Sequence, residues 1–168
     1  MGMYPGGNIV KLTPSDLSAT AYTEGDIIFA KNEIKNAVPS RGGSSILVSM
    51  SLYAGTTTDT NLGILFFDND TSIGAAANEA ITNVSDAEFQ AAGFIGAVEL
   101  DGAESTISVG NGLVYFPGTN NSSNAGFPAL LKAADGKTSI WFIAVTKGGT
   151  PTYAANGLDF TFNVQYLG

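Results

Sequence analysis

The clearest pattern in the chain is an alternation of apolar and polar residues near its C-terminus. From residue 158 to residue 166, every second residue is apolar and the residues between are polar. The apolar set is Leu158, Phe160, Phe162, Val164 and Tyr166, and the polar set is Asp159, Thr161, Asn163 and Gln165. Because successive side chains of a strand point to opposite faces, this period predicts a half-buried strand of an antiparallel sheet.

A second long strand is predicted over residues 137–147, KTSIWFIAVTK. Apolar residues occupy both parities from Ile140 to Val145. Such a run is typical of a central strand that is covered on both faces, or of a strand whose outer face contacts a partner. The pattern by itself leaves both interpretations open.

Further strands and few helices complete the pattern. Apolar or alternating segments also lie at residues 9–12, 26–30, 45–53, 61–67, 93–100, 105–109 and 113–116. Ser85 and Glu88 are spaced as a capping box before a short helix, and residues 127–132 are expected to form one more helical turn. About nine short strands separated by Gly or Asn turns predict an all-β fold, a single jelly-roll-like antiparallel β-sandwich with one or two short helices in its connecting loops.

The length of 168 residues fits one domain. We expect residues 1–15 to form an N-terminal arm, because Pro5 is followed by Gly6 and Gly7 and the first residues carry little pattern. Residues 16–168 are expected to form the β-sandwich domain.

Composition excludes several classes of function. The chain has no His and no Cys, which removes Ser-His-Asp triads, thiol enzymes and ordinary zinc sites. Its net charge is −8 and its Lys and Arg residues are scattered, so nucleic acid is not an expected partner. No apolar run approaches the ~18 residues needed to span a bilayer, so no membrane association is expected.

The best metal candidate is the acidic turn at residues 68–72. Oxygen ligands at its first, third and fifth positions, with Glu79 at the twelfth, resemble a calcium loop. Ile73 stands where that loop requires Gly. Carboxylate pairs for glycoside hydrolysis would be Asp68/Asp70 or Glu99/Asp101, but acids so close in sequence are usually a solvated turn. We therefore expect no enzyme activity, no catalytic residue, no metal and no cofactor.

From about residue 21 onward, the chain resembles a family of small bacteriophage virion proteins. The segments that carry the resemblance are TEGDIIFAKNEIKNAV (23–38), GGSSILVSMSLY (42–53), LGILFFDND (62–70) and LLKAADGKTSIWFIAVTKGGTPTYAANGLDFTFNVQYL (130–167). The resemblance implies a capsid decoration (cement) protein, a β-sandwich homotrimer that binds major capsid protein on the outer surface of the head. It also implies synthesis in the cytoplasm of the bacterial host.

Two segments are expected to make the capsid or subunit contacts, the arm at residues 1–12 and the strand at 139–147. The residues expected to do so are Met3, Tyr4, Pro5, Ile9, Trp141, Ile143 and Val145. The alternative is a receptor-binding module of a phage tail or fibre, a carbohydrate-binding β-sandwich. In that case the polar loop at 119–124 and an exposed Tyr or Trp would bind sugar.

Overall fold

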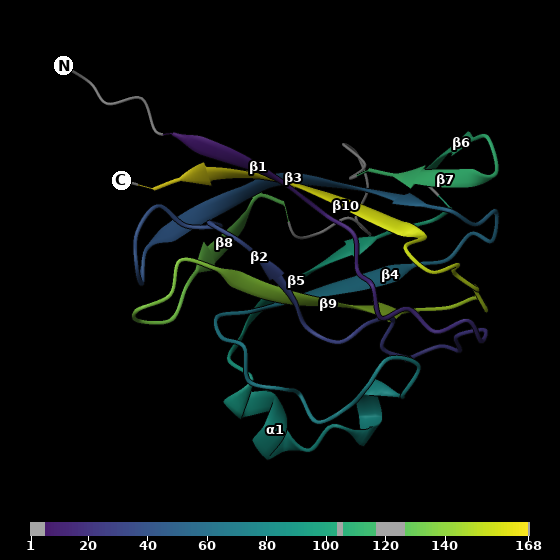
Figure 1. Cartoon of the computed structure of the whole chain (residues 1–168), viewed down its shortest axis with the longest axis horizontal. Helices are drawn as coiled ribbons and strands as arrows, with labels where there is room; N and C mark the ends of the chain where they lie inside the picture. The colour runs from purple at the N-terminus through teal and green to yellow at the C-terminus, as the bar shows by residue number, and fades with distance from the viewer. Residues whose placement is uncertain (1–5, 104–105, 117–126, 168) are drawn as a thin grey trace.

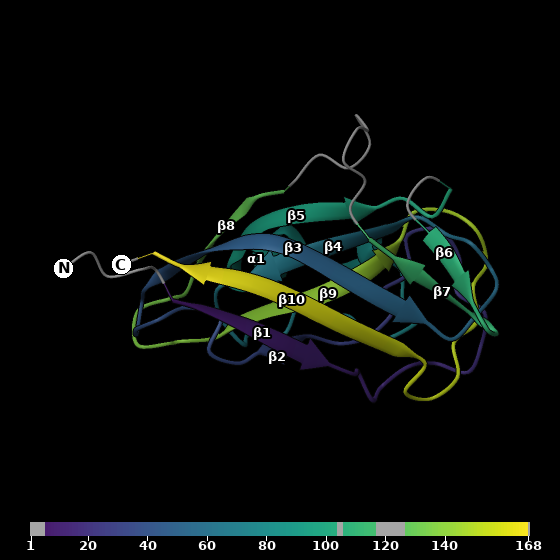
Figure 2. The ribbon, with the colours of Figure 1, turned by 90° about the horizontal axis from the view of Figure 1, so that it is seen from above.

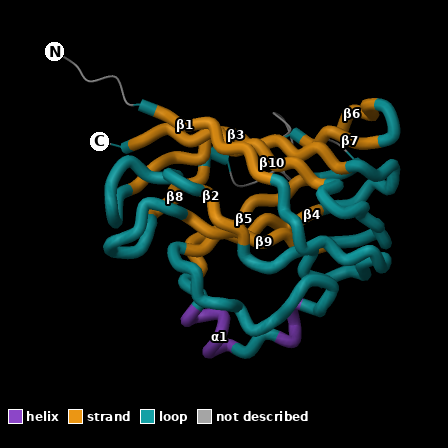
Figure 3. Tube along the Cα trace, viewed as in Figure 1, coloured by secondary structure: helices purple, strands orange, loops and turns teal. Residues whose placement is uncertain are grey.

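The computed structural model describes residues 6–103, 106–116 and 127–167, and it contains two antiparallel sheets that face each other (Figures 1 and 3). The six-stranded sheet has the order β1 (Gly7–Leu12), β10 (Leu158–Tyr166), β3 (Ser44–Ala54), β7 (Gly112–Tyr115) and β6 (Thr106–Val109), with β8 (Ala129–Lys132) also paired to β3. The four-stranded sheet has the order β2 (Asn32–Ile34), β9 (Ile140–Thr146), β4 (Leu62–Phe67) and β5 (Phe94–Leu100). The predicted all-β sandwich is confirmed.

The alternation over residues 158–166 is confirmed in β10. This strand lies between β1 and β3, and its apolar side chains point into the space between the sheets. Phe160 and Phe162 meet Phe142 of the facing sheet, with ring centroids 5.1 Å and 4.9 Å apart. Both contacts are edge-to-face, the arrangement that the charge distribution of aromatic rings favours. These rings lie at the centre of the hydrophobic core.

The run over residues 140–145 forms β9, a central strand between β2 and β4. All seven of its residues are buried. Side chains of one parity enter the core between the sheets, and those of the other parity belong to a second hydrophobic cluster. Of the two interpretations that the sequence left open, coverage on both faces is therefore the one found.

The second cluster lies beneath the connection between β4 and β5, which forms a third layer on the four-stranded sheet (Figures 1 and 3). This layer contains a 3-10 turn, Ile81–Asn83, and the helix α1, Asp86–Ala91. The capping box is confirmed: the amide N–H of Glu88 donates to Ser85 Oγ, and the amide N–H of Ser85 donates to Glu88 Oε2. Both short helices lie in a connecting loop, as predicted.

Three local predictions differ from the structure. Residues 7–12 of the expected arm form β1, which confirms the strand predicted at 9–12; because its full length pairs with β10, this part of the arm is an edge strand of the sandwich. Residues 26–30 form two isolated bridges and no strand. Residues 127–132 were expected to be helical, but 129–132 form β8, because pairing with β3 satisfies backbone groups that a single helical turn leaves open.

Candidate functional site

The inner side of each sheet is buried, and the two outer sides differ. The outer side of the four-stranded sheet is covered by the β4–β5 connection, through a cluster that includes Phe67, Ile73 and Ala92. The outer side of the six-stranded sheet, seen from above in Figure 2, is covered by no described segment. This uncovered side, here called the open face, is therefore the place to look for a binding surface.

The expected contact residues of the 139–147 strand are buried in the interior of the protein. Trp141 is 8% exposed, Val145 is 7% exposed and Ile143 is completely buried. All three lie under the β4–β5 connection, so the partner of this strand face is another segment of the same chain. The expectation that these side chains contact a capsid or a neighbouring subunit is corrected, since none of them is available at the surface.

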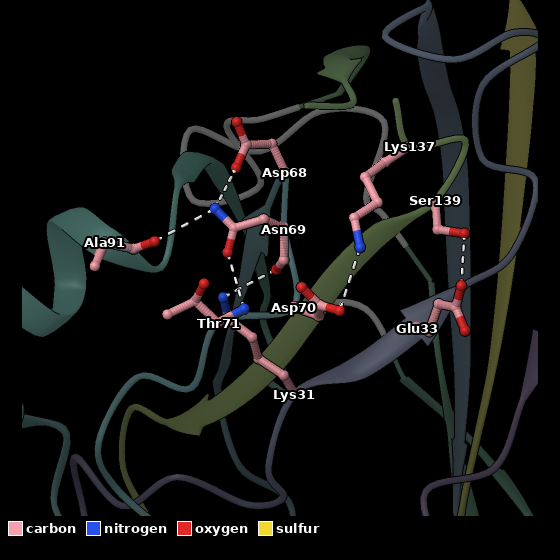
Figure 4. Close-up of polar contacts among 9 residues, drawn as sticks. All are labelled: Lys31, Glu33, Asp68, Asn69, Asp70, Thr71, Ala91, Lys137 and Ser139. Atoms are coloured by element: carbon pink, nitrogen blue, oxygen red, sulfur yellow. Dashed lines mark hydrogen bonds and ion pairs between the residues drawn. The ribbon is translucent and has the colours of Figure 1, made fainter. Parts of the chain in front are cut away.

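Lys31 attaches the β4–β5 connection to the sheet at both of its ends. Figure 4 shows the contact with Asn69. Its ammonium group donates to the carbonyl oxygens of Asn69, at 3.2 Å, and of Ala92, at 2.8 Å. It also lies 4.1 Å from the ring centroid of Phe67. Burial lowers the pKa of Lys31 from 10.5 to about 8, although Asp68 and Asp70 partly oppose this shift. The group therefore has a structural role that also makes it sensitive to pH.

The acidic turn after β4 is held by the protein itself (Figure 4). Asp68 accepts from the side-chain amide of Asn69 at 2.8 Å, and Asn69 in turn accepts from the backbone N–H of Thr71 at 2.9 Å. Asp70 forms an exposed ion pair with Lys137 at 3.3 Å. Glu79 accepts from the backbone N–H of Ala76. Among the described residues, no group of three or more acidic side chains is placed to hold a metal ion.

Glu99 and Asp101, the second pair of carboxylates, have different partners. Glu99 forms an ion pair with Lys147 at 2.6 Å. Asp101 is 8% exposed and accepts from the backbone N–H of Ala103 at 2.9 Å, as in a local turn. Neither acid faces a cavity with the other, so this pair supplies no arrangement for glycoside hydrolysis.

Strand register divides the open face into rows of side chains that cross the sheet. The two rows nearest the chain termini contain exposed aliphatic side chains. In the first row, Gln165 pairs with Ile46, which pairs with Leu130. In the second row, Ile9 pairs with Asn163, beside a bulge that turns Val48 outward. We call Ile9, Ile46, Val48 and Leu130 the apolar end of the open face. Leu130, Ile9 and Val48 are 62%, 65% and 48% exposed.

The two rows at the opposite end of the open face enclose a hollow of about 390 Å³. In one row Lys11 pairs with Thr161, which pairs with Ser51, and in the next row Asp159 pairs with Tyr53, which pairs with Val114. All six of these side chains line the hollow, together with Thr13, whose hydroxyl donates to Asp159 Oδ1. Four strands, β1, β10, β3 and β7, therefore meet at this hollow.

A glycine fixes the position of the tyrosine in this hollow. Tyr53 is 38% exposed, and its ring lies against Gly112 of the neighbouring strand β7. A Cβ atom added to Gly112 would lie 2.6 Å from the Tyr53 hydroxyl oxygen and 2.7 Å from its Cε2 atom. The absence of a side chain at position 112 therefore allows the ring to lie across the sheet with its other side open to solvent.

Charge is scarce on the open face. Lys11 and Asp159 are the only charged residues in the rows that run from β1 through β10 to β3, although the chain as a whole carries a net charge of −8. Lys132 of β8 adds one exposed charge on the same side. The other outward side chains of these rows are Ser, Thr, Asn, Gln, Tyr or aliphatic residues. A surface with this composition costs less to desolvate than a charged one.

Of the contact residues expected near the N-terminus, the structure describes only Ile9. Ile9 lies on the open face and is 65% exposed. Met3, Tyr4 and Pro5 lie outside the described residues. Sequence reasoning missed Tyr53 and Gly112, because a period of two places Tyr53 on the polar side of its strand but gives no sign that a glycine of another strand lies beneath it. The loop at 119–124 also lies outside the described residues.

A scan against models of known protein families matched none of them, and a search of curated proteins found no match. In the part of the chain that the structure describes, no helix is both long and apolar enough to cross a membrane.

Proposed function

We propose that this chain is a bacteriophage capsid decoration protein that binds the major capsid protein through the apolar end of its open face. The observation that carries the proposal is that Ile9, Val48 and Leu130 are exposed at one end of the open face. The charged side chains of this sheet side nearest to them are Lys11 on β1 and Lys132 on β8. Burying an aliphatic side chain of this size contributes about 1.5–3 kcal/mol, so a small apolar contact supplies useful affinity. Repetition of the contact by the symmetry of a capsid multiplies its effect.

The strand order supports the jelly roll expected from the sequence. One row is β1-β10-β3 continued by β7 and β8 along the two halves of β3, and the facing row is β2-β9-β4-β5. The chain crosses between the rows several times, as in the paired Greek keys of viral capsid domains. This similarity of architecture is an analogy and carries less weight than the open face itself.

The proposal places the protein on the outer surface of the virion as a homotrimer, after synthesis in the cytoplasm of the bacterial host. Its action is mechanical and involves no reaction, cofactor or metal. Immunogold electron microscopy of the phage particles tests the location. Label distributed over the whole head is the expected result, whereas label restricted to the tail or to one vertex contradicts a decoration role.

A co-sedimentation assay with capsids that lack the protein tests the surface. We expect the double variant Ile9→Ser/Leu130→Ser to lose most of its binding. Ile107→Ser is the matched control, because Ile107 is 57% exposed but lies on β6, at the far edge of the same sheet. Equal binding by the double variant and the wild type would remove the apolar end from the mechanism. Sedimentation equilibrium of the free chain tests the trimer separately.

A receptor-binding module of a tail or fibre is the second candidate. The observation that favours it is the exposed ring of Tyr53, which lies in a polar hollow. Immunogold label on the tail or fibre would support this function in place of decoration.

A further inference from the structure

The hollow around Tyr53 has the size and composition of a small-molecule site. Its volume of about 390 Å³ lies in the range of roughly 300–1,000 Å³ that such sites occupy. Its lining combines one exposed aromatic ring, that of Tyr53, with hydroxyl groups and two opposite charges. We infer that this hollow binds one neutral sugar residue of a glycan, with the pyranose ring stacked on Tyr53.

The first step of the argument is the shape of the aromatic surface. A pyranose presents a face of C–H groups bordered by hydroxyls, and it needs a flat, accessible ring on which that face can lie. Tyr53 offers such a ring, because Gly112 allows one side to rest on the sheet while the other remains open. A ring held in place before binding loses little rotamer entropy when a ligand arrives, which favours affinity.

The second step is the ring of polar groups around the tyrosine. Asp159 is a strong acceptor for sugar hydroxyls, and the hydroxyl of Thr13 holds its Oδ1 atom. Within the described part of the chain no donor is bonded to Asp159 Oδ2, so this atom is available to a ligand. Lys11 supplies donors, and the hydroxyls of Ser51 and Thr161 both donate and accept. Sugar hydroxyls require this mixture of donors and acceptors.

The third step is charge. The one ammonium group and the one carboxylate of the hollow balance each other, so the site has no net attraction for an anion. A phosphate or a nucleotide would favour a cluster of basic groups, which is not found among the residues that line the hollow. A divalent cation would favour several carboxylates, whereas Asp159 is the only acid in the lining. A neutral glycan satisfies the site better than either ion.

The hollow and the apolar end lie at opposite ends of the open face, so the two proposals can be tested separately. The sugar site does not rest on the decoration function, and its test uses the isolated chain without capsids. Loss of sugar binding with retained capsid binding, or the reverse, therefore identifies which proposal has failed.

The experiment is an NMR titration of the isotopically labelled chain with four probes: maltotriose, lactose, methyl α-mannoside and N-acetylglucosamine. We expect at least one probe to shift the amide signals of Tyr53, Gly112 and Thr161 in a saturable manner. Tyr53→Phe keeps the stacking ring and should bind within about twofold of the wild type, whereas Tyr53→Ala should bind about tenfold more weakly or worse. Both changes are at an exposed side chain, and near-ultraviolet circular dichroism checks that both variants are folded.

Gly112→Ala tests the geometry of the ring. This change removes no group that contacts sugar, but its Cβ atom would lie 2.6 Å from both the Tyr53 hydroxyl oxygen and the Ala54 carbonyl oxygen, so the ring and the adjoining strand must shift. We therefore expect weaker binding, and near-ultraviolet circular dichroism again checks that the variant is folded. Gly110→Ala is its control, since no atom lies within 4 Å of a Cβ added there. The inference is overturned if none of the four probes shifts these amides, or if Tyr53→Ala binds the active probe as well as Tyr53→Phe does.

Discussion

Three buried tyrosines allow the contribution of single hydroxyl groups to be measured by the same deletion. Tyr22 and Tyr115 are completely buried and Tyr153 is 1% exposed. The Tyr22 hydroxyl donates to the carbonyl oxygen of Ile28 at 2.9 Å and accepts from the backbone N–H of Ser18 at 2.6 Å. The Tyr115 hydroxyl accepts from the backbone N–H of Thr60 at 3.3 Å. The Tyr153 hydroxyl has no hydrogen-bond partner among the described residues.

We predict that Tyr→Phe changes the free energy of unfolding in opposite directions at these positions. A buried polar group without a partner costs about 1–3 kcal/mol, so Tyr153→Phe should stabilise the protein by about 1 kcal/mol. Tyr115→Phe leaves one backbone donor without its partner and should destabilise by about 1 kcal/mol, and Tyr22→Phe breaks two bonds and should destabilise by about 2 kcal/mol. The aromatic contact between Tyr22 and Tyr153 is retained in both variants.

Urea unfolding followed by the fluorescence of the single Trp, with calorimetry for Tm, measures these effects. For a chain of this length 1 kcal/mol corresponds to a Tm change of about 2–4 °C. The expected order of stability is Tyr153→Phe, wild type, Tyr115→Phe and Tyr22→Phe. A destabilised Tyr153→Phe variant would refute the reasoning, because it would mean that this hydroxyl has a stabilising partner.

Three further predictions concern pH and backbone conformation. Burial raises the pKa of Tyr115 to about 12, whereas an unfolded tyrosine releases its proton near pH 10. The free energy of unfolding should therefore fall from about pH 10 to 12. Urea titrations at each pH should show a less steep fall for Tyr115→Phe than for the wild type. For Lys31 the dependence of stability on pH has the opposite sign. Its pKa is about 8 in the folded protein, so above pH 8 the unfolded state binds more protons, and the free energy of unfolding should rise from pH 8 to 10. Equal slopes of stability against pH in the wild type and in Lys31→Met would contradict this role. Gly93 has φ +70°, and a Cβ there would lie 1.9 Å from Asp68 Oδ1. Gly93→Ala should therefore lower Tm more than Gly110→Ala, which has φ +59° and open space and should cost about 1–2 kcal/mol; equal Tm values would show that the Asp68 turn yields without cost.

Local patterns determined much of the fold. The alternation in β10 requires one buried and one exposed face, and the doubly apolar run in β9 requires a central position, because the period of side chains along a strand is fixed at two. The capping box at Ser85 and Glu88 likewise depends only on residues within one turn of helix. Interactions between residues so close in sequence do not depend on the tertiary fold, so the sequence pattern predicts them directly.

The features that the sequence did not predict depend on residues far apart along the chain. Only the tertiary structure decided that the β4–β5 connection covers Trp141, Ile143 and Val145, because the pattern records that a face is apolar and not what covers it. Short β8 forms a strand because β3 offers it a free edge. The same reason applies to the hollow, where Lys11, Tyr53 and Asp159 become neighbours only through the register of three strands. Sequence by itself thus determined the elements and their buried faces, whereas long-range pairing decided which surface stayed open and which side chains met on it.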